Sequence, residues 1–187
     1  MINRGLSKTS AYVFNADTGM LEKKDPQTIE SLSKQLNKSI RNLEDITENK
    51  KQYLDLLLLA DEQEDMVDRY LDNGKMYVLD DNGVKCECVI TDKENDILEI
   101  KNIATVPEYQ GKGYARALIE FIVNNYREQY AILQVGTGDS PLTIPFYEKC
   151  GFVRSHIISN FFIDNYDHPI YESGIQLVDM VYLQRPL

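Results

Sequence analysis

The sequence predicts an α/β fold in which a mixed central sheet is flanked by helices and preceded by an N-terminal extension. Strand-like segments with turn residues between them fill residues 75–106, which indicates consecutive hairpins. Strand and helix then alternate toward the C-terminus, the order of a layered α/β sheet. The chain has 187 residues, 43% of them hydrophobic, which fits one domain with a sizeable core and a small appendage.

Residues 1–36 are expected to form the extension. Residues 1–43 carry seven positive and four negative side chains, whereas the remaining chain is strongly acidic, so the composition changes near residue 40. Residues 10–14 and 20–22 flank an Asn/Asp/Gly cluster, which predicts a hairpin. Asp25-Pro26 has the N-cap and first-turn proline of a helix start, and apolar residues follow at helical spacing. No function follows from this segment.

Apolar spacing assigns the elements up to residue 106. A short strand is expected at 39–43, a helix at 47–60 with its apolar face at 53, 54, 57 and 58, and a second helix around 66–70. Asp72-Asn73-Gly74 ends that second helix. Strands at 75–79 and 84–91 flank Asn82-Gly83, a strong hairpin signal because this pair tolerates positive φ. Residues 97–106 add a third strand.

The C-terminal half alternates helices and strands. A helix is expected after residue 113, with its apolar face from Leu118 to Tyr126. A strand at 130–137, a helix at 140–150 and strands at 152–159 and 176–183 complete the sheet. A loop containing His168-Pro169 and Ser173-Gly174 separates the last two strands.

The turn between residues 106 and 116 is the segment that points to chemistry. Gly111 and Gly113 open a helix directly after a strand, and a helix start presents free amide hydrogens and a positive dipole end that bind phosphates. Lys112 and Arg116 add positive charge there. A P-loop is excluded because residue 106 is Val and Lys112 is followed by Gly. A dinucleotide fingerprint is excluded because its third glycine position is Arg116. A plain glycine-rich helix start is the alternative.

Two segments together resemble the GNAT superfamily of N-acetyltransferases. Gln110-x-x-Gly113-x-Ala115 after Val-Pro-Glu-Tyr is similar to its acetyl-CoA pyrophosphate loop, and Pro145-Phe-Tyr-Glu-Lys-Cys-Gly-Phe152 is similar to its Tyr-Glu-Lys-x-Gly-Phe segment. One helix and one strand separate the two, as in the superfamily. The resemblance covers residues 37–187 and implies a GNAT-like, mixed but mostly antiparallel sheet, within an uncharacterised bacterial branch.

The resemblance implies roles for particular residues. Tyr147 corresponds to the tyrosine that protonates the departing thiolate, and Glu99 to the position where many members carry a general base. The alternatives are a packing tyrosine and an exposed strand carboxylate paired with Lys101. Acetyl-CoA is expected on the backbone of Ile103, Ala104 and Thr105 and on the loop from Gln110 to Arg116, that is Gln110, Gly111, Lys112, Gly113, Tyr114, Ala115 and Arg116. Ser140 stands where the family often has a cofactor-contacting Asn.

The implied activity is acetyl transfer from acetyl-CoA, with no metal, to a primary amine of a small molecule or peptide. A non-catalytic CoA-binding or protein-interaction module is the alternative. A net charge of −10 argues against nucleic acid and anionic membranes as partners. The chain has three cysteines, Cys86, Cys88 and Cys150, and this odd number favours buried reduced thiols over a disulfide framework. No apolar run is long enough to cross a bilayer, so a cytoplasmic location is expected. The Phe161-Phe162 pair and the extension are candidate homodimer surfaces.

Overall fold

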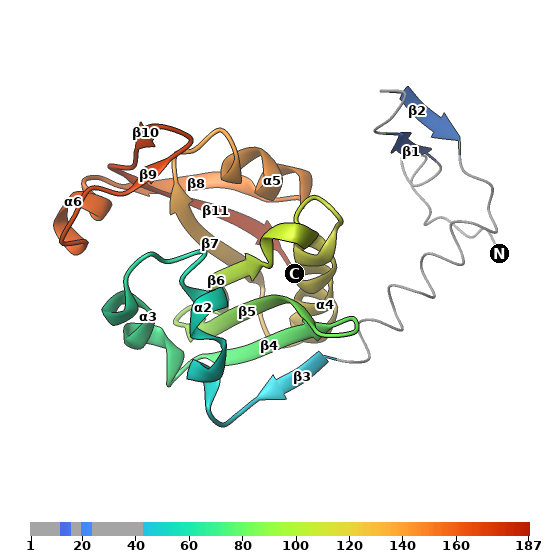
Figure 1. The fold of residues 1–187 in the computed structure, drawn as a ribbon, viewed down its shortest axis with the longest axis horizontal. Helices are drawn as coiled ribbons and strands as arrows, with labels where there is room; N and C mark the ends of the chain where they lie inside the picture. The colour runs from blue at the N-terminus through green and yellow to red at the C-terminus, as the bar shows by residue number, and fades with distance from the viewer. Residues whose placement is uncertain (1–11, 16–19, 24–42) are drawn as a thin grey trace. The chain divides into compact units, whose positions relative to one another are not determined.

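The structure, a computed structural model, describes residues 12–15, 20–23 and 43–187 (Figure 1). The chain divides into two units, residues 1–41 and 42–187. In the first unit, β1 (Tyr12–Asn15) pairs antiparallel with β2 (Met20–Lys23), with Tyr12 opposite Lys23, so the expected hairpin is present. The helix expected after Asp25 lies outside the described residues.

The second unit is built on a seven-stranded sheet. Its strands are β3 (Leu43–Ile46), β4 (Lys75–Asp80), β5 (Val84–Lys93), β6 (Ile97–Thr105), β7 (Ile132–Gly138), β8 (Val153–Ile158) and β11 (Met180–Pro186). They lie in the order β3-β4-β5-β6-β7-β11-β8. Every neighbouring pair is antiparallel except β6 and β7. The predicted mixed, mostly antiparallel sheet is therefore confirmed.

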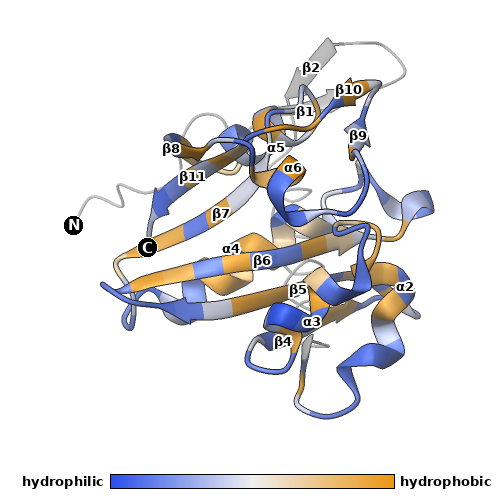
Figure 2. Cartoon of the chain, turned by 90° about the vertical axis from the view of Figure 1, so that its left-hand side faces the viewer, coloured by the Kyte–Doolittle hydropathy of each residue, from blue (hydrophilic) through white to orange (hydrophobic). Residues whose placement is uncertain are grey.

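Helices cover both faces of this sheet (Figure 2). On one face lie a short 3-10 turn η2 (Lys50–Tyr53), α2 (Leu54–Leu57) and α3 (Glu64–Leu71). On the other lies α4 (Tyr114–Tyr126), which follows the 3-10 turn η3 (Pro107–Tyr109), and beside it α5 (Thr143–Lys149). Arg116 of α4 donates a hydrogen bond from Nη2 to the Lys149 carbonyl at 2.9 Å, which joins α4 to α5.

Apolar side chains fill both sides of the sheet. On the α2 and α3 side the buried cluster comprises Ile46, Leu57, Val67, Tyr70, Leu71, Met76, Val78 and Val89. On the α4 side Leu118, Ile119 and Ile122 are fully buried, and the hydroxyls of Tyr77 and Tyr126 are hydrogen-bonded at 2.6 Å. Each such aliphatic side chain contributes about 1.5–3 kcal/mol of transfer free energy, so this burial fixes the sheet between its two helical layers.

The N-terminal part of this unit differs from the prediction. The first strand is Leu43–Ile46 rather than 39–43, of which 39–42 lie outside the described residues. The expected helix at 47–60 is reduced to η2 and α2. It starts at residue 50 because Asn49, its N-cap, has φ of 51°, and it ends at Leu57. Lys50 Nζ then donates to the carbonyls of Leu71 at 2.8 Å and Gly74 at 2.6 Å, which ties this segment to the end of α3.

The loop expected between the last two strands has structure of its own. It contains α6 (Phe161–Asn165) and a small hairpin of β9 (Tyr171–Glu172) and β10 (Ile175–Gln176). Phe162 is buried with Ile170 and Leu177, and Phe161 is partly buried against the same cluster, so both members of the candidate dimer pair pack within their own chain. No helix among the described residues has both the length and the apolar character needed to cross a membrane.

The parallel pair β6 and β7 separates along its length. Pairing runs only from Ile97 opposite Ile132 to Ile100 opposite Val135. Beyond this point β6 continues to Thr105 on β5, and β7 continues to Gly138 on β11. The two strands therefore open into a gap in the middle of the sheet, next to the carboxyl end of β6.

Candidate active site

A cavity of about 390 Å³ occupies the gap between β6 and β7. Ile103, Ala104 and Thr105 line it from β6, Gly136 to Gly138 from β7, and Tyr147 from α5. Because β6 has lost β7 as a hydrogen-bonding neighbour here, its backbone groups on this edge are available to an extended ligand, in the manner of an added strand. All three predicted β6 residues therefore border one cavity.

The glycine turn lies at the end of the same strand. Gly111 has φ of 70°, and Gly113, with φ of 92°, is the N-cap of the 13-residue helix α4. A Cβ placed on either glycine would meet no atom within 4 Å, so the space outside the turn is open to a ligand. A second cavity, of about 320 Å³, is formed here, and Thr105 lines it as well as the first. The two cavities thus lead from the helix start into the gap.

Two ammonium groups lie against the Tyr109 ring, beside the glycine turn. The Lys112 ammonium lies 4.9 Å from the centre of the Tyr109 ring, and the Lys85 ammonium lies 4.2 Å from it. Lys85 was not expected from the sequence, because it comes from β5 and only the fold brings it to the turn. Lys85 is buried and donates from Nζ to the Asn82 carbonyl at 3.1 Å, whereas Lys112 belongs to the turn itself. A helix start with an ammonium group in its own turn favours a polyanion such as a diphosphate.

Three of the predicted loop side chains hold the turn in place. Gln110 Nε2 donates to the Thr105 carbonyl at 3.2 Å, and the Tyr114 hydroxyl donates to Asp81 Oδ2 at 2.8 Å. Arg116 is bonded to the end of α5, as described above. Ala115 lines the second cavity with Tyr114 and Arg116. The sequence signal at these positions thus reflects turn geometry as well as charge.

Tyr147 lies in α5 with its ring packed edge-on against Phe146 and Phe152, at 5.1 and 5.7 Å between ring centres. It is buried, with 6% of its surface exposed, yet it lines the main cavity. Burial raises the pKa of its phenol well above the ordinary value, so the hydroxyl keeps its proton at neutral pH. This combination suits a proton donor to a group bound in the gap.

Glu99 is buried in β6, with 1% of its surface exposed. Its Oε1 lies 2.9 Å from Lys101 Nζ and its Oε2 lies 2.8 Å from Lys93 Nζ, so both carboxylate oxygens are ion-paired. Pairing with Lys101 was the alternative role expected from the sequence, although for an exposed side chain. Glu99 does not line the main cavity but a side cavity of about 250 Å³, which Lys101 and Ile100 line with it.

Ser140 lies apart from the other predicted contacts. It is buried before α5, and its Oγ accepts a hydrogen bond from the Leu142 amide at 3.1 Å. Its carbonyl accepts from the Ile144 amide at 3.3 Å, so the residue organises the start of α5 and lines none of the three cavities described.

Asp61 is the first residue of an acidic run, residues 61–68, whose sequence suggests an exposed helix face that could attract a cationic acceptor if it borders the site. It lies where the main and side cavities meet and lines both. Its Oδ1 accepts a hydrogen bond from the Tyr166 hydroxyl at 2.9 Å and its Oδ2 accepts one from the Tyr70 hydroxyl at 3.3 Å. Burial raises the pKa of Asp61, and these two hydrogen bonds oppose the increase. Tyr166 follows Asp61 by more than a hundred residues, so no local pattern could have revealed the cluster.

The cysteines take no part in the site. Cys86, Cys88 and Cys150 are free and buried, which confirms the expectation of reduced thiols. Burial raises the pKa of Cys86 to about 12, so this thiol is not ionised at neutral pH. Among the described residues, no three His, Cys, Asp or Glu side chains are arranged to hold a metal ion.

Comparison with known proteins agrees with this geometry. Residues 72–154 match the family model described as an acetyltransferase (GNAT) domain. The chain is 36% identical over 132 residues to the uncharacterized N-acetyltransferase YvbK of Bacillus subtilis, a match that covers 69% of this chain and 85% of that protein.

Two solved structures share the fold. A GNAT family acetyltransferase from Elizabethkingia anophelis, solved with acetyl-CoA bound, has a TM-score of 0.74 and 34% identity, over 78% of this chain and 97% of that one. A Bacillus subtilis acetyltransferase in complex with CoA has a TM-score of 0.71 and 34% identity over the same shares. With the splayed strands, the glycine turn and the buried tyrosine, these similarities lead to one conclusion: the chain belongs to the GNAT family of acetyltransferases.

Proposed function

We propose that this protein uses acetyl-CoA to acetylate a primary amine of a small molecule or peptide. The observation that carries the proposal is the continuity of the site: the helix start at Gly113, the free edge of β6 and Tyr147 border two adjoining cavities. A diphosphate at one end and a thioester at the other would span that path. Acetyl-CoA is a cytoplasmic metabolite, so we place the reaction in the cytoplasm.

Each part of the site has a task in this reaction. Amides from Gly111 to Ala115, with Lys112 beside them, would bind the diphosphate. The free edge of β6 at Ile103, Ala104 and Thr105 would hold the pantetheine arm, and an amide hydrogen there would polarise the thioester carbonyl. The neutral amine then attacks the carbonyl carbon, the C–S bond breaks, and Tyr147 gives its phenolic proton to the sulfur before regaining one from solvent.

An amine that enters as an ammonium ion loses one proton to become the nucleophile and a second as the amide forms. We assign the removal of these protons to Glu99, which acts through water and passes each to solvent, or to water itself. A bridging water is needed because Glu99 lines the side cavity whereas Tyr147 lines the main one.

Isothermal titration calorimetry with acetyl-CoA is the first test, and a panel of primary amines assayed by release of free CoA is the second. We expect binding at one site per chain and release of CoA that depends on an added amine. No binding at millimolar acetyl-CoA would refute the proposal.

A CoA-binding module without turnover is the second candidate. It is favoured by the double ion pairing of Glu99 and by the position of Ser140 outside the cavities. Binding of acetyl-CoA without CoA release from any amine of the panel would support it.

A further inference from the structure

We infer that the amine acceptor also carries a carboxylate: Asp61 binds its ammonium group and Arg69 binds its carboxylate. The inference specifies the acceptor of the proposed function and rests on it. It comes from the side cavity that adjoins the thioester site, and from the two charged groups of that cavity that have no ionic partner among the described residues.

Asp61 provides the negative end. It borders the main cavity, which Tyr147 also lines, so an amine bound to it lies next to the space assigned to the thioester. Each of its oxygens accepts one tyrosine hydroxyl, and a carboxylate has further lone pairs for an ammonium group. Within the part of the chain that the structure describes, no Lys or Arg lies within ion-pair distance of Asp61.

Arg69 provides the positive end. It projects from α3 and lines the side cavity with Asp61. Its one side-chain hydrogen bond within residues 45–187 is from Nη1 to Asn165 Oδ1, at 3.2 Å, and no carboxylate of those residues lies within ion-pair distance. A guanidinium has five N–H donors in a planar fork, so most of them are left for a bound carboxylate.

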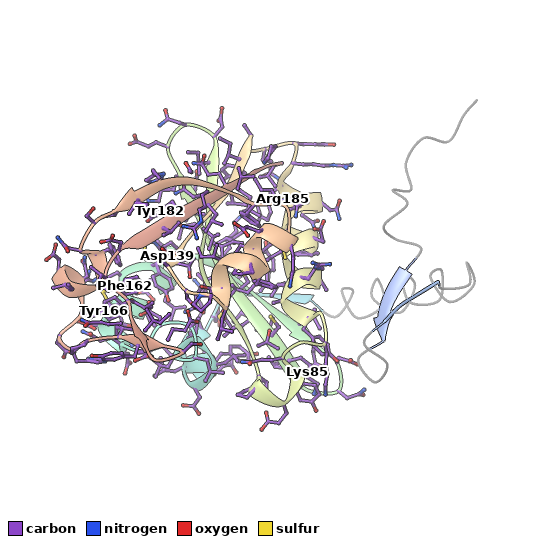
Figure 3. All side chains as sticks on the ribbon, turned by 90° about the horizontal axis from the view of Figure 1, so that it is seen from above. Lys85, Asp139, Phe162, Tyr166, Tyr182 and Arg185 are labelled. Atoms are coloured by element: carbon purple, nitrogen blue, oxygen red, sulfur yellow. The ribbon has the colours of Figure 1, made fainter. Side chains whose placement is uncertain are left out.

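The other two charged groups that line the side cavity, Glu99 and Lys101, form an ion pair with each other. Lys101, whose charge also acts on Asp61, lies 2.9 Å from Oε1 of Glu99, and Lys93 lies 2.8 Å from Oε2. Between the two ends, the walls are aromatic or thioether side chains: Tyr70, Phe161, Tyr166, Met66 and Met180. Tyr166 stacks on Phe162, and Figure 3 shows both on the same side of the molecule. Such walls suit a short methylene chain between the charges.

The test compares two series of acceptors after acetyl-CoA binding has been measured by calorimetry. One series is n-propylamine to n-hexylamine, and the other is the ω-aminocarboxylates with three to six methylene groups. We expect kcat/KM for the best aminocarboxylate to exceed that of its matched alkylamine about tenfold or more, the size of a charge-assisted hydrogen bond.

Variants then assign the effect. Arg69→Gln is expected to raise KM for the aminocarboxylate about tenfold, which brings the ratio of kcat/KM between the two series close to one. Arg69→Lys should restore part of the preference for the aminocarboxylate. Asp61→Asn should lower kcat/KM for both series about tenfold or more. Arg127→Gln, at an exposed arginine after α4, is the matched control and should leave kcat/KM for both series unchanged.

Three results would overturn the inference. The first is that kcat/KM is equal for the two series. The second is that Arg69→Gln leaves the ratio of kcat/KM between the series unchanged. The third is that a protein that binds acetyl-CoA acetylates no compound of either series. Failure to bind acetyl-CoA would refute the proposed function itself, and the calorimetric step separates that outcome from the other three.

Discussion

Replacing Glu87 by Gln should stabilise the protein, and by an amount that depends on pH. Glu87 lies in β5 with none of its surface exposed, and neither of its carboxyl oxygens has a hydrogen-bond partner. Its cross-strand neighbours are Val78 and Ala104. Burial raises the pKa of Glu87 from 4.5 to about 8, although the Ala104 backbone amide opposes the increase.

Linkage between protonation and folding gives the direction and the size of the effect of Glu87 on the free energy of unfolding. Between pH 4.5 and about 8 the unfolded chain has lost the Glu87 proton while the folded chain keeps it. The free energy of unfolding therefore falls as pH rises, by about 1.4 kcal/mol per pH unit. The accumulated loss at pH 8 is roughly 5 kcal/mol, a large part of the 5–15 kcal/mol typical of a domain. Below pH 4.5 this contribution of Glu87 to stability is fully present.

Urea unfolding followed by circular dichroism from pH 5 to 8.5 measures the free energy of unfolding of Glu87→Gln and of the wild type. The difference in unfolding free energy between Glu87→Gln and the wild type should grow by about 1.4 kcal/mol per pH unit and level off above pH 8. Glu94→Gln, at an exposed turn residue, is the control and should follow the wild-type curve. A constant difference between Glu87→Gln and the wild type across this range would refute the reasoning.

Three further predictions concern the site. Tyr147→Phe should lower kcat about 10²-fold or more with acetyl-CoA affinity unchanged, since only the acidic proton is lost; unchanged kcat at every pH would remove Tyr147 from the mechanism. Gly113→Val should weaken acetyl-CoA binding at least tenfold in calorimetry and lower Tm, because a φ of 92° costs a branched residue about 1–3 kcal/mol; wild-type affinity would argue against the loop assignment. Glu99→Gln should lower kcat about 10²-fold in the CoA-release assay, and an unchanged kcat would leave Glu99 a purely structural role.

Much of the sheet could be predicted because its signals are local. Asn82 and Gly83, with φ of 56° and 104°, make the turn that their sequence indicates. The apolar face of α4 follows from spacing alone, since Leu118, Ile119 and Ile122 recur at helical period and are fully buried. The two glycines at the start of α4 could be identified because few residues other than glycine adopt positive φ readily.

The remaining features depend on contacts between distant residues. Asp61 acquires its environment from Tyr166, and Lys85 reaches the glycine turn only when β5 lies beside β6. Glu87, between two cysteines of a strand, has the alternation of a half-exposed strand, but α2 and α3 cover that face. The helix expected at 47–60 starts later than predicted because Asn49 adopts positive φ, which the apolar spacing does not encode.

The most direct test of the account follows the backbone amides by ¹H–¹⁵N NMR while CoA is added. If a diphosphate binds at the start of α4 and the pantetheine arm along β6, the largest shift changes should occur for the amides of residues 111–115 and 103–105. Amides of β3, at the far edge of the sheet, should stay constant. Saturable binding whose shift changes lie elsewhere, or no change at millimolar CoA, would contradict the account.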